Sequence, residues 1–240
     1  MKRGYFHPNH CEDFLMTAKL SPEKTMAVVL DGCSMGVYSV FAAHLLGKVL
    51  RASAQSVYAQ NFRNSSALTL GESLTEIMQI TWSELIRIRQ QLQLTRTELL
   101  TTMILAVVDE DEKQAEILIA GDGVVQVDQD FIEFDQGNKP DYLGYHLNKT
   151  FEDWRADHTQ QLSVPEFRDL SISTDGILSF QNLEAKELHF PIEEAIHELL
   201  VDRSGSDSSQ MLKHKAHQLE RHKGLVCTDD LAIIRMIAQE

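Results

Sequence analysis

The chain has no long hydrophobic run and few cysteines. Its apolar stretches, such as 26–30 and 117–120, are far shorter than the roughly 20 residues of a membrane-spanning helix, and the first ten residues contain no apolar signal core. The three cysteines, Cys11, Cys33 and Cys227, have no paired spacing. This pattern favours free thiols in a reducing compartment over a disulfide framework. We therefore expect a cytoplasmic protein without a membrane segment.

Positive charge is scarce as well. The 22 lysines and arginines are outnumbered by 36 aspartates and glutamates, which gives a formal net charge of −14. Such a charge repels nucleic acids and anionic membrane surfaces, so neither is expected as a partner. With 240 residues, of which 43% are hydrophobic, the chain can bury one sizeable core. We expect a single domain over residues 1–240.

Short β-branched runs and longer amphipathic stretches alternate irregularly along the chain. Strands are predicted at 26–30, 103–108, 116–120, 124–127, 131–134, 170–174 and 231–237. The short links 109–113 and 128–130 predict hairpins, so part of the sheet structure is expected to be antiparallel. Helices are predicted after Gly36, from Ser73 with Glu76 in a capping box, after Pro191, and over 208–221 before Gly224. These features indicate an α+β protein.

One long segment, 135–165, shows neither strand nor helix periodicity. It is rich in Gly, Asn, Asp and Pro. Irregular segments of this length in compact domains are usually functional or mobile. The segment is therefore either a flap beside an active site or a disordered loop.

Acidic residues recur at the ends of the predicted strands. Carboxylates at strand ends, from segments far apart in sequence, can meet at one edge of a sheet, where their repulsion is costly unless a cation lies between them. An apolar run ends in Asp-Gly three times, and two further acidic pairs stand directly before apolar runs: these acids are Asp31, Asp122, Asp175, the pair Asp229 and Asp230, and the pair Glu12 and Asp13.

The chemistry of these acids indicates which cation they would bind. Carboxylate and backbone oxygens without a histidine cluster favour Mg²⁺ or Mn²⁺ over zinc or copper. Two such ions can generate hydroxide and stabilise an in-line attack on phosphorus. Asp-Gly is also a common turn dipeptide after a strand, which is the better explanation for any one of these sites taken alone. The set as a whole favours a metal centre.

A different hydrolase is also suggested by the segment 32–36. Its sequence, GCSMG, fits the G-x-S-x-G pattern of a nucleophile elbow between a strand and a helix, with Ser34 as the nucleophile. However, at most one strand precedes it, no glycine-rich oxyanion loop lies upstream, and the acids at the strand ends would remain unexplained. A serine esterase is the less favoured alternative.

The ordered motifs resemble those of the metal-dependent protein serine/threonine phosphatases of type 2C. The series spans nearly the whole chain and runs CEDF, VVLDG before a helix, TTMILAVV, IAGDG, STDGI and TDDLAII. The resemblance implies a four-layer αββα sandwich, in which two mostly antiparallel β-sheets stack and helices cover both outer faces. It also implies an enzyme that hydrolyses phosphoserine or phosphothreonine in a phosphoprotein substrate.

The resemblance assigns roles residue by residue. It implies that Asp31 bridges two Mn²⁺ or Mg²⁺ ions and that the Gly32 carbonyl and Glu12 or Asp13 serve one of them. Both of these acids would line the site, one of them through water. The other ion would be held by two further acids, and water held by the metals would attack the phosphoester directly. These two acids are Asp175 and Asp229.

Several positions depart from the family pattern. Pro8 stands where members usually have an arginine that grips the substrate phosphate. The nearby candidates for this role are Arg3, His7, His10 and Cys33. The third-metal position of Asp122 is retained, whereas Ser179 stands where another third-metal acid often occurs. A second alternative is therefore a phosphatase-like binding or regulatory module with weak catalysis.

Each cysteine lies within two residues of a candidate acid. If the acids converge, the thiols lie near the metals, and a nearby cation favours the oxidisable thiolate. Cys33 is the one predicted to be exposed, because it occupies the turn that faces the presumed phosphate. The alternative is that all three thiols are small buried side chains.

Overall fold

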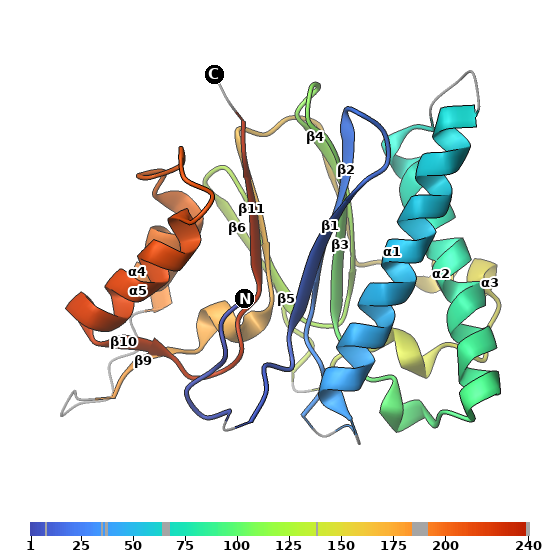
Figure 1. Cartoon of the computed structure of the whole chain (residues 1–240), viewed down its shortest axis with the longest axis horizontal. Helices are drawn as coiled ribbons and strands as arrows, with labels where there is room; N and C mark the ends of the chain where they lie inside the picture. The colour runs from blue at the N-terminus through green and yellow to red at the C-terminus, as the bar shows by residue number, and fades with distance from the viewer. Residues whose placement is uncertain are drawn as a thin grey trace.

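Two antiparallel β-sheets stack face to face, and helices cover the outer face of each sheet (Figure 1). This is the arrangement that the sequence motifs predicted. The computed structural model describes residues 1–7, 9–34, 36, 38–63, 68–137, 139–183 and 192–238. The predicted helix start at Pro191 lies outside the described residues.

The first sheet has five strands in the order β1-β2-β3-β4-β7, and all of its neighbours are antiparallel. Its strands are β1 (Phe14–Lys19), β2 (Lys24–Leu30), β3 (Met103–Asp109), β4 (Gln114–Ala120) and β7 (Gln161–Val164). The hairpin predicted at 109–113 joins β3 to β4. The sequence did not predict β1, because FLMTAK contains one β-branched residue and lacks a clear alternation.

The second sheet has the order β11-β8-β5-β6 and is also antiparallel. Its strands are β5 (Gly123–Val127), β6 (Asp130–Phe134), β8 (Asp169–Ser173) and β11 (Ile233–Ile237). A two-stranded ladder of β9 (Phe180–Asn182) and β10 (Leu225–Cys227) lies beside it. The hairpin predicted at 128–130 joins β5 to β6, so both predicted hairpins are confirmed.

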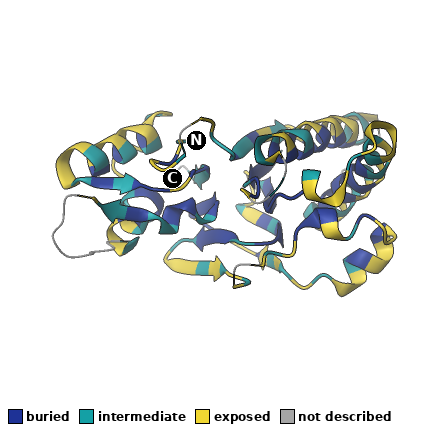
Figure 2. Cartoon of the chain, turned by 90° about the horizontal axis from the view of Figure 1, so that it is seen from below, coloured by how far each residue is buried: buried dark blue, intermediate teal, exposed yellow. Residues whose placement is uncertain are grey.

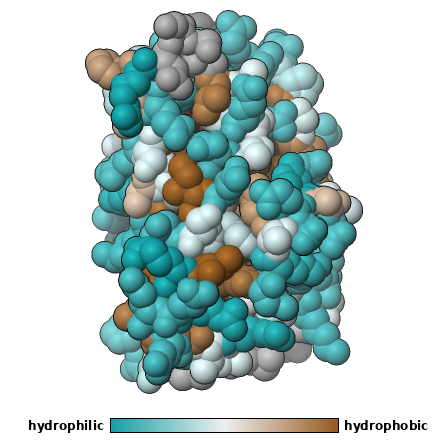
Figure 3. Space-filling view, turned by 90° about the vertical axis from the view of Figure 1, so that its right-hand side faces the viewer, coloured by the Kyte–Doolittle hydropathy of each residue, from teal (hydrophilic) through white to brown (hydrophobic). Residues whose placement is uncertain are grey.

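Helices α1 (Ser39–Arg63), α2 (Leu70–Leu92) and α3 (Phe151–Asp157) cover the first sheet. The prediction that the second helix begins at Ser73 was wrong. The capping box is formed one turn earlier, by Thr69 and Glu72, and Ser73 is buried inside the helix. The outward face of this layer is mainly hydrophilic, with scattered hydrophobic side chains (Figure 3).

The second helical layer contains α4 (Ile192–Ile196), a π-helical segment His197–Val201, and α5 (Met211–Lys223), which ends at Gly224 with φ of 66°. Arg235 of β11 fastens this layer to the second sheet. Its guanidinium pairs with Asp169 of β8 and donates to the carbonyls of Leu199, Val201 and Asp202. The π-helical segment is thereby held at its carboxyl end.

Three apolar layers separate the four structural layers. One lies between α1 to α3 and the first sheet, one between the two sheets, and one between the second sheet and α4 and α5. Accordingly, the strands are largely buried, whereas the helices bury one face and expose the other (Figure 2). None of the helices within the described ranges is long and apolar enough to span a membrane.

The segment 135–165 is not an irregular flap, contrary to expectation. It contains a 3₁₀ turn at Leu143–Tyr145, helix α3 and strand β7. Trp154 of α3 is buried and stacks on Trp82 of α2 with ring centroids 4.9 Å apart. This aromatic contact explains the difference, because it gives a polar segment a few well-placed anchors that a periodicity search does not detect.

Candidate metal centre

Four aspartates from distant segments face one another at one end of the sandwich. Asp31 follows β2, Asp175 follows β8, Asp229 precedes β11 and Asp13 precedes β1. Burial, and after it the negative charges of the other three, raises the pKa of Asp31 well above its ordinary value. The sheet topology brings these acids together, because the two stacked sheets end at the same place.

The cluster is electrostatically unfavourable when no cation is present. Burial is the largest cause of the raised pKa of Asp13, about 7, and the charges of Asp230 and Asp175 add to it. Burial also raises the pKa of Asp175 to about 6, with the charges of Asp229 and Asp122 as further causes. Carboxyls that resist ionisation in this way are typical of functional sites.

Asp13 is the most deeply buried of these acids, with 1% of its surface exposed. One carboxylate oxygen, Oδ2, accepts a hydrogen bond of 2.7 Å from the Thr174 hydroxyl. The other oxygen, Oδ1, is buried and has no hydrogen-bond partner when the acids are ionised, since the neighbouring Asp31 carboxyl can bond to Asp13 only if one of the two is protonated. A buried carboxylate oxygen without a partner costs free energy, so it is a position where a cation or a bound water fits.

The turn that carries Asp31 is held from both sides. The Asp31 carbonyl accepts bonds of 2.8 Å from the amide of Thr102 and from the hydroxyl of Thr101. At the next residue, a Cβ on Gly32 would lie 2.2 Å from the carbonyl oxygen of Ser39. Only glycine therefore allows the start of α1 to pack against this turn.

The segments that carry Asp175 and Asp229 also pack backbone against backbone. A Cβ on Gly176 would lie 1.8 Å from the carbonyl oxygen of Asp230. Ser179 joins the two segments, since its hydroxyl donates to the Gly176 carbonyl and accepts from the Asp229 amide, at 2.8 and 3.0 Å. Ser179 thus has a structural role at a position where members of the resembling family often have an acid for a third metal.

Asp230, which was predicted only as one of the acids at strand ends and without a role of its own, organises the amino-terminal side of the site. It is 2% exposed, accepts a bond of 2.7 Å from the Gly4 amide, and also accepts from the Glu12 amide. Its second oxygen lies 2.9 Å from Nδ1 of His7. The sequence contains Asp230 as the second acid of TDD. From this position it could have been predicted to hold the segment with Glu12 and Asp13.

His7 lies between the last two acids. Its Nε2 is 3.1 Å from Asp229 and its Nδ1 is 2.9 Å from Asp230. Burial lowers the pKa of His7, but the charge of Asp230, the hydrogen bond to it and the charge of Asp229 raise it above the ordinary value on balance. The imidazole that precedes Pro8 in the sequence is thereby favoured in its cationic form.

The other predicted site residues are distributed around this cluster. His10 is exposed and lines a cavity of about 580 Å³ with His7, Glu12 and the start of α1. Arg3 is exposed on the amino-terminal segment. Asp122 accepts a bond of 2.9 Å from the Gln136 amide, and its charge contributes to the raised pKa of Asp175.

The prediction that Cys33 is exposed was wrong. Its side chain is buried against Leu100 and Tyr142, and its amide donates to the Leu100 carbonyl at 3.1 Å. Burial and nearby carboxylates raise the pKa of the other two thiols, Cys11 and Cys227, to about 12. The buried alternative therefore describes Cys33 and Cys227, and Cys11 is half-buried.

The nucleophile-elbow hypothesis does not fit the local structure. Such a serine sits on a tight turn that leads directly from a strand into a helix. Ser34 is exposed, and helix α1 begins only at Ser39. Because β2 ends at Leu30 and α1 begins at Ser39, Ser34 does not lie where a strand leads directly into a helix.

The donor chemistry fits hard divalent cations. The cluster offers carboxylate oxygens, one of them buried and unpartnered, and no thiolate or imidazole set. Within the described ranges, no group of three or more His, Cys, Asp or Glu side chains is arranged so that it could hold a metal ion. The acids of this cluster are neighbours without forming a closed ligand set.

The chain belongs to the protein phosphatase 2C family. The family model described as "Protein phosphatase 2C" matches residues 7–216. No curated protein matches the sequence significantly. Membership defines the class as a phosphatase fold whose family activity is metal-dependent serine/threonine dephosphorylation.

Solved structures share the fold at low sequence identity. The SiaA-PP2C domain of Pseudomonas aeruginosa is 14% identical with a TM-score of 0.57, over 95% of this chain and 81% of that one. Stp1 from Staphylococcus aureus is 15% identical with a TM-score of 0.56, over 100% and 92% of the two chains. The SpoIIE phosphatase domain with a regulatory fragment from Bacillus subtilis is 14% identical with a TM-score of 0.58, and the match covers 98% of this chain but 61% of that one.

Proposed function

We propose that this chain is a phosphatase that depends on two Mn²⁺ or Mg²⁺ ions and hydrolyses phosphoserine or phosphothreonine in a protein substrate. The observation that carries the proposal is the cluster of four aspartates whose charges oppose one another, with one buried carboxylate oxygen left unpartnered. Divalent cations would supply Lewis acidity and activate water for direct hydrolysis. The three free cysteines are consistent with a cytoplasmic location.

Each residue of the cluster has a role in this proposal. Asp31 would bridge the two ions, with the Gly32 carbonyl and Asp13 or Glu12 on one of them. Asp175 and Asp229 would hold the other, and Asp122 is the candidate for a third. Family membership and the mutual pKa effects of the acids support these roles.

The phosphate grip would differ from that of a typical member. His7 stands next to the position of the missing arginine and is favoured in its cationic form by Asp230 and Asp229. His10 lines the cavity beside it. We propose that these histidines orient the substrate phosphate through ring N–H groups.

Turnover of p-nitrophenyl phosphate and of a phosphothreonine peptide tests the proposal. We expect Mn²⁺-dependent turnover that a chelator abolishes, and a loss of at least about 100-fold in Asp175→Asn. Asp111→Asn, in the exposed β3–β4 hairpin, is the matched control and should retain full activity. Metal-independent turnover, or full activity of Asp175→Asn, would contradict the proposal.

A regulatory binding module is the second candidate. It is favoured by Pro8 at the arginine position and by His7, which already engages Asp229. In this case Mn²⁺ should promote binding of the phosphopeptide without turnover. Calorimetry and product release measured on the same sample distinguish the two functions.

A further inference from the structure

Strand β11 is the edge strand of the second sheet, and the hydrogen bonds at its two ends show which residues point outward. The Thr174 amide donates to the Ala232 carbonyl at 3.1 Å, and the Ala238 amide donates to the Arg168 carbonyl at 2.9 Å. In an antiparallel pair, alternate residues bond to the same neighbour. The even-numbered residues of β11 therefore bond to β8, and the odd-numbered residues point their amide and carbonyl groups away from it.

The first outward position is already paired. The amides of Lys2 and Leu231 each donate to the carbonyl of the other, at 2.8 and 2.9 Å. The outward row then continues through Ile233, Arg235 and Ile237. Within the described part of the chain, no backbone partner is present for these three residues on this side. The row is a short, open template for strand pairing.

This edge lacks the devices that usually prevent strand addition. The only charged residue of β11, Arg235, has a side chain that is 1% exposed and is turned inward to Asp169. The strand contains neither proline nor an outward-facing charge. The opposite edge of the same sheet, β6, instead carries Asp130 and Glu133. Natural edge strands are commonly protected by charges of this kind.

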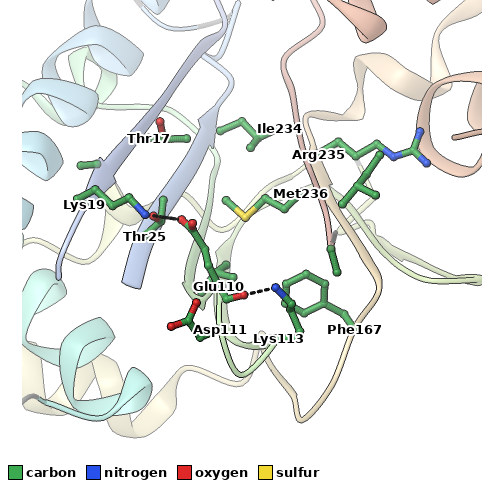
Figure 4. A pocket seen from close by; sticks show the side chains of 14 residues that line it. Thr17, Lys19, Thr25, Glu110, Asp111, Lys113, Phe167, Ile234, Arg235 and Met236 are labelled. Atoms are coloured by element: carbon green, nitrogen blue, oxygen red, sulfur yellow. Dashed lines mark hydrogen bonds and ion pairs between the residues drawn. The ribbon is translucent and has the colours of Figure 1, made fainter. Parts of the chain in front are cut away.

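Cavities on both faces of β11 provide room for the side chains of an added strand. A cavity of about 790 Å³ separates β11 from β1, and Ile234 and Met236 point into it while Arg235 points away (Figure 4). Phe167 lies at its inner wall, and the ion pair of Lys19 with Glu110 lies at its rim. On the other face, a groove of about 520 Å³ between β11 and α5 is lined by Leu231, Ile233, Leu212 and Ala216, among others.

We propose that the outer edge of β11 binds an extended segment of a partner protein, which adds to the second sheet as an antiparallel strand. Its backbone would bond to Ile233, Arg235 and Ile237, and its apolar side chains would alternate between the two cavities. The segment would be about five residues long, because Lys2 occupies the next position. It would continue the direction of the Lys2–Leu231 bridge.

The same bridge argues against a second copy of β11 as the occupant. In a two-fold antiparallel pair centred on Arg235, Ala238 of the second copy would face Ala232. The amino terminus, which pairs with Leu231 through Lys2, already occupies this neighbourhood in both copies. A segment that ends before Lys2 meets no such obstacle.

Amide hydrogen exchange of the full chain tests the proposal with a defined probe. The probe is the blocked hexapeptide Thr-Val-Thr-Val-Thr-Val. Two control peptides of the same sequence carry N-methyl groups on alternate residues, one on the odd-numbered and the other on the even-numbered positions. In the free protein, the amides of Ile233, Arg235 and Ile237 should exchange quickly. Millimolar probe should slow them by roughly tenfold, whereas the amides of Ile234 and Met236 should be slow throughout. The N-methylated peptide that lacks the donors facing β11 should have no effect.

Two variants separate edge binding from general effects. Ile237→Pro removes an outward donor without removing a bond to β8, and Met236→Lys places a charge at the cavity. Both should lose the response to the probe while keeping the circular-dichroism spectrum of the parent. Phe131→Lys, on the opposite edge of the same sheet, should retain the response.

Three results would overturn the proposal. The first is slow exchange of the three outward amides in the free protein at low concentration. The second is protection of these amides that rises with protein concentration and accompanies dimerisation in sedimentation, which would assign the edge to a second copy. The third is equal protection by the probe and by both N-methylated peptides.

Discussion

The buried carboxyl of Asp13 makes a specific prediction about stability. Asp13→Asn removes a negative charge from the acidic cluster, and its side-chain oxygen can still accept the Thr174 hydroxyl. We expect the metal-free variant to be more stable than the parent at pH 8. We also expect Mn²⁺ to stabilise the variant less than the parent, because the variant loses a proposed ligand.

The sign and size follow from the pKa of Asp13. The folded-state pKa of about 7 lies above the ordinary value of 3.8, so above pH 4 the folded state binds more protons than the unfolded state. Stability therefore falls as the pH rises from about 4 to about 7. The gap corresponds to roughly 4 kcal/mol, since one pKa unit is worth about 1.4 kcal/mol. Because Asp13 interacts with Asp31 and Asp175, this free energy is distributed over the three acids. We therefore expect the free energy of unfolding of the variant to be higher than that of the parent by about 2–4 kcal/mol.

Urea unfolding at pH 5 and pH 8, in the presence of a chelator, measures the effect. The parent should lose stability between the two values, and Asp13→Asn should lose less. Asp111→Asn, in the exposed hairpin, is the control and should follow the parent. A parent that becomes more stable between pH 5 and 8, or a variant that shows the same decrease as the parent, would contradict this prediction.

Three further substitutions test other parts of the site and its support. Asp230→Ala should destabilise the fold by about 1–3 kcal/mol and lower Mn²⁺-dependent turnover, because the Gly4 and Glu12 amides lose a buried acceptor; the combined readout is urea unfolding and kinetics. Asp169→Asn should lower the free energy of unfolding by about 3–5 kcal/mol, because the buried Arg235 guanidinium loses its counter-charge. An unchanged midpoint of urea unfolding would contradict this. Gly32→Ala should shift the melting temperature down by several degrees, since its Cβ would meet the backbone of α1.

The sequence predicted most strands of the two sheets because they are apolar and rich in β-branched residues, whereas the four-layer arrangement was implied by the resemblance to the type 2C phosphatases. Both hairpins and the two long helices were found, although the start of α2 was misplaced by one turn because Ser73 and Glu76 imitate the box formed by Thr69 and Glu72. Strand β1 was missed, since its place depends on pairing with β2 rather than on its own composition.

The site was predictable only in part. Acids that follow or precede strands could be expected to meet, and the structure places Asp13, Asp31, Asp175 and Asp229 within electrostatic reach of one another. Their role as metal ligands remains a prediction. The burial of Cys33 under Tyr142 could not be predicted, because it depends on a contact between segments more than 100 residues apart. The position of Asp230 in TDD marked it as a candidate, but its bonds to the amino-terminal segment appear only in the folded structure.

The bonds from Asp230 to the first residues of the chain also determine when the site can form during synthesis. The acids near residue 12 are positioned by a residue 218 positions later. At roughly 5–20 residues per second, synthesis reaches Asp230 about 10–40 s after it has passed Glu12. A nascent or carboxyl-truncated chain can therefore form much of the first sheet and its helices while it lacks the assembled acidic cluster. Until the segment that carries Asp230 has been made, the acidic pair near residue 12 lacks the residue that positions it.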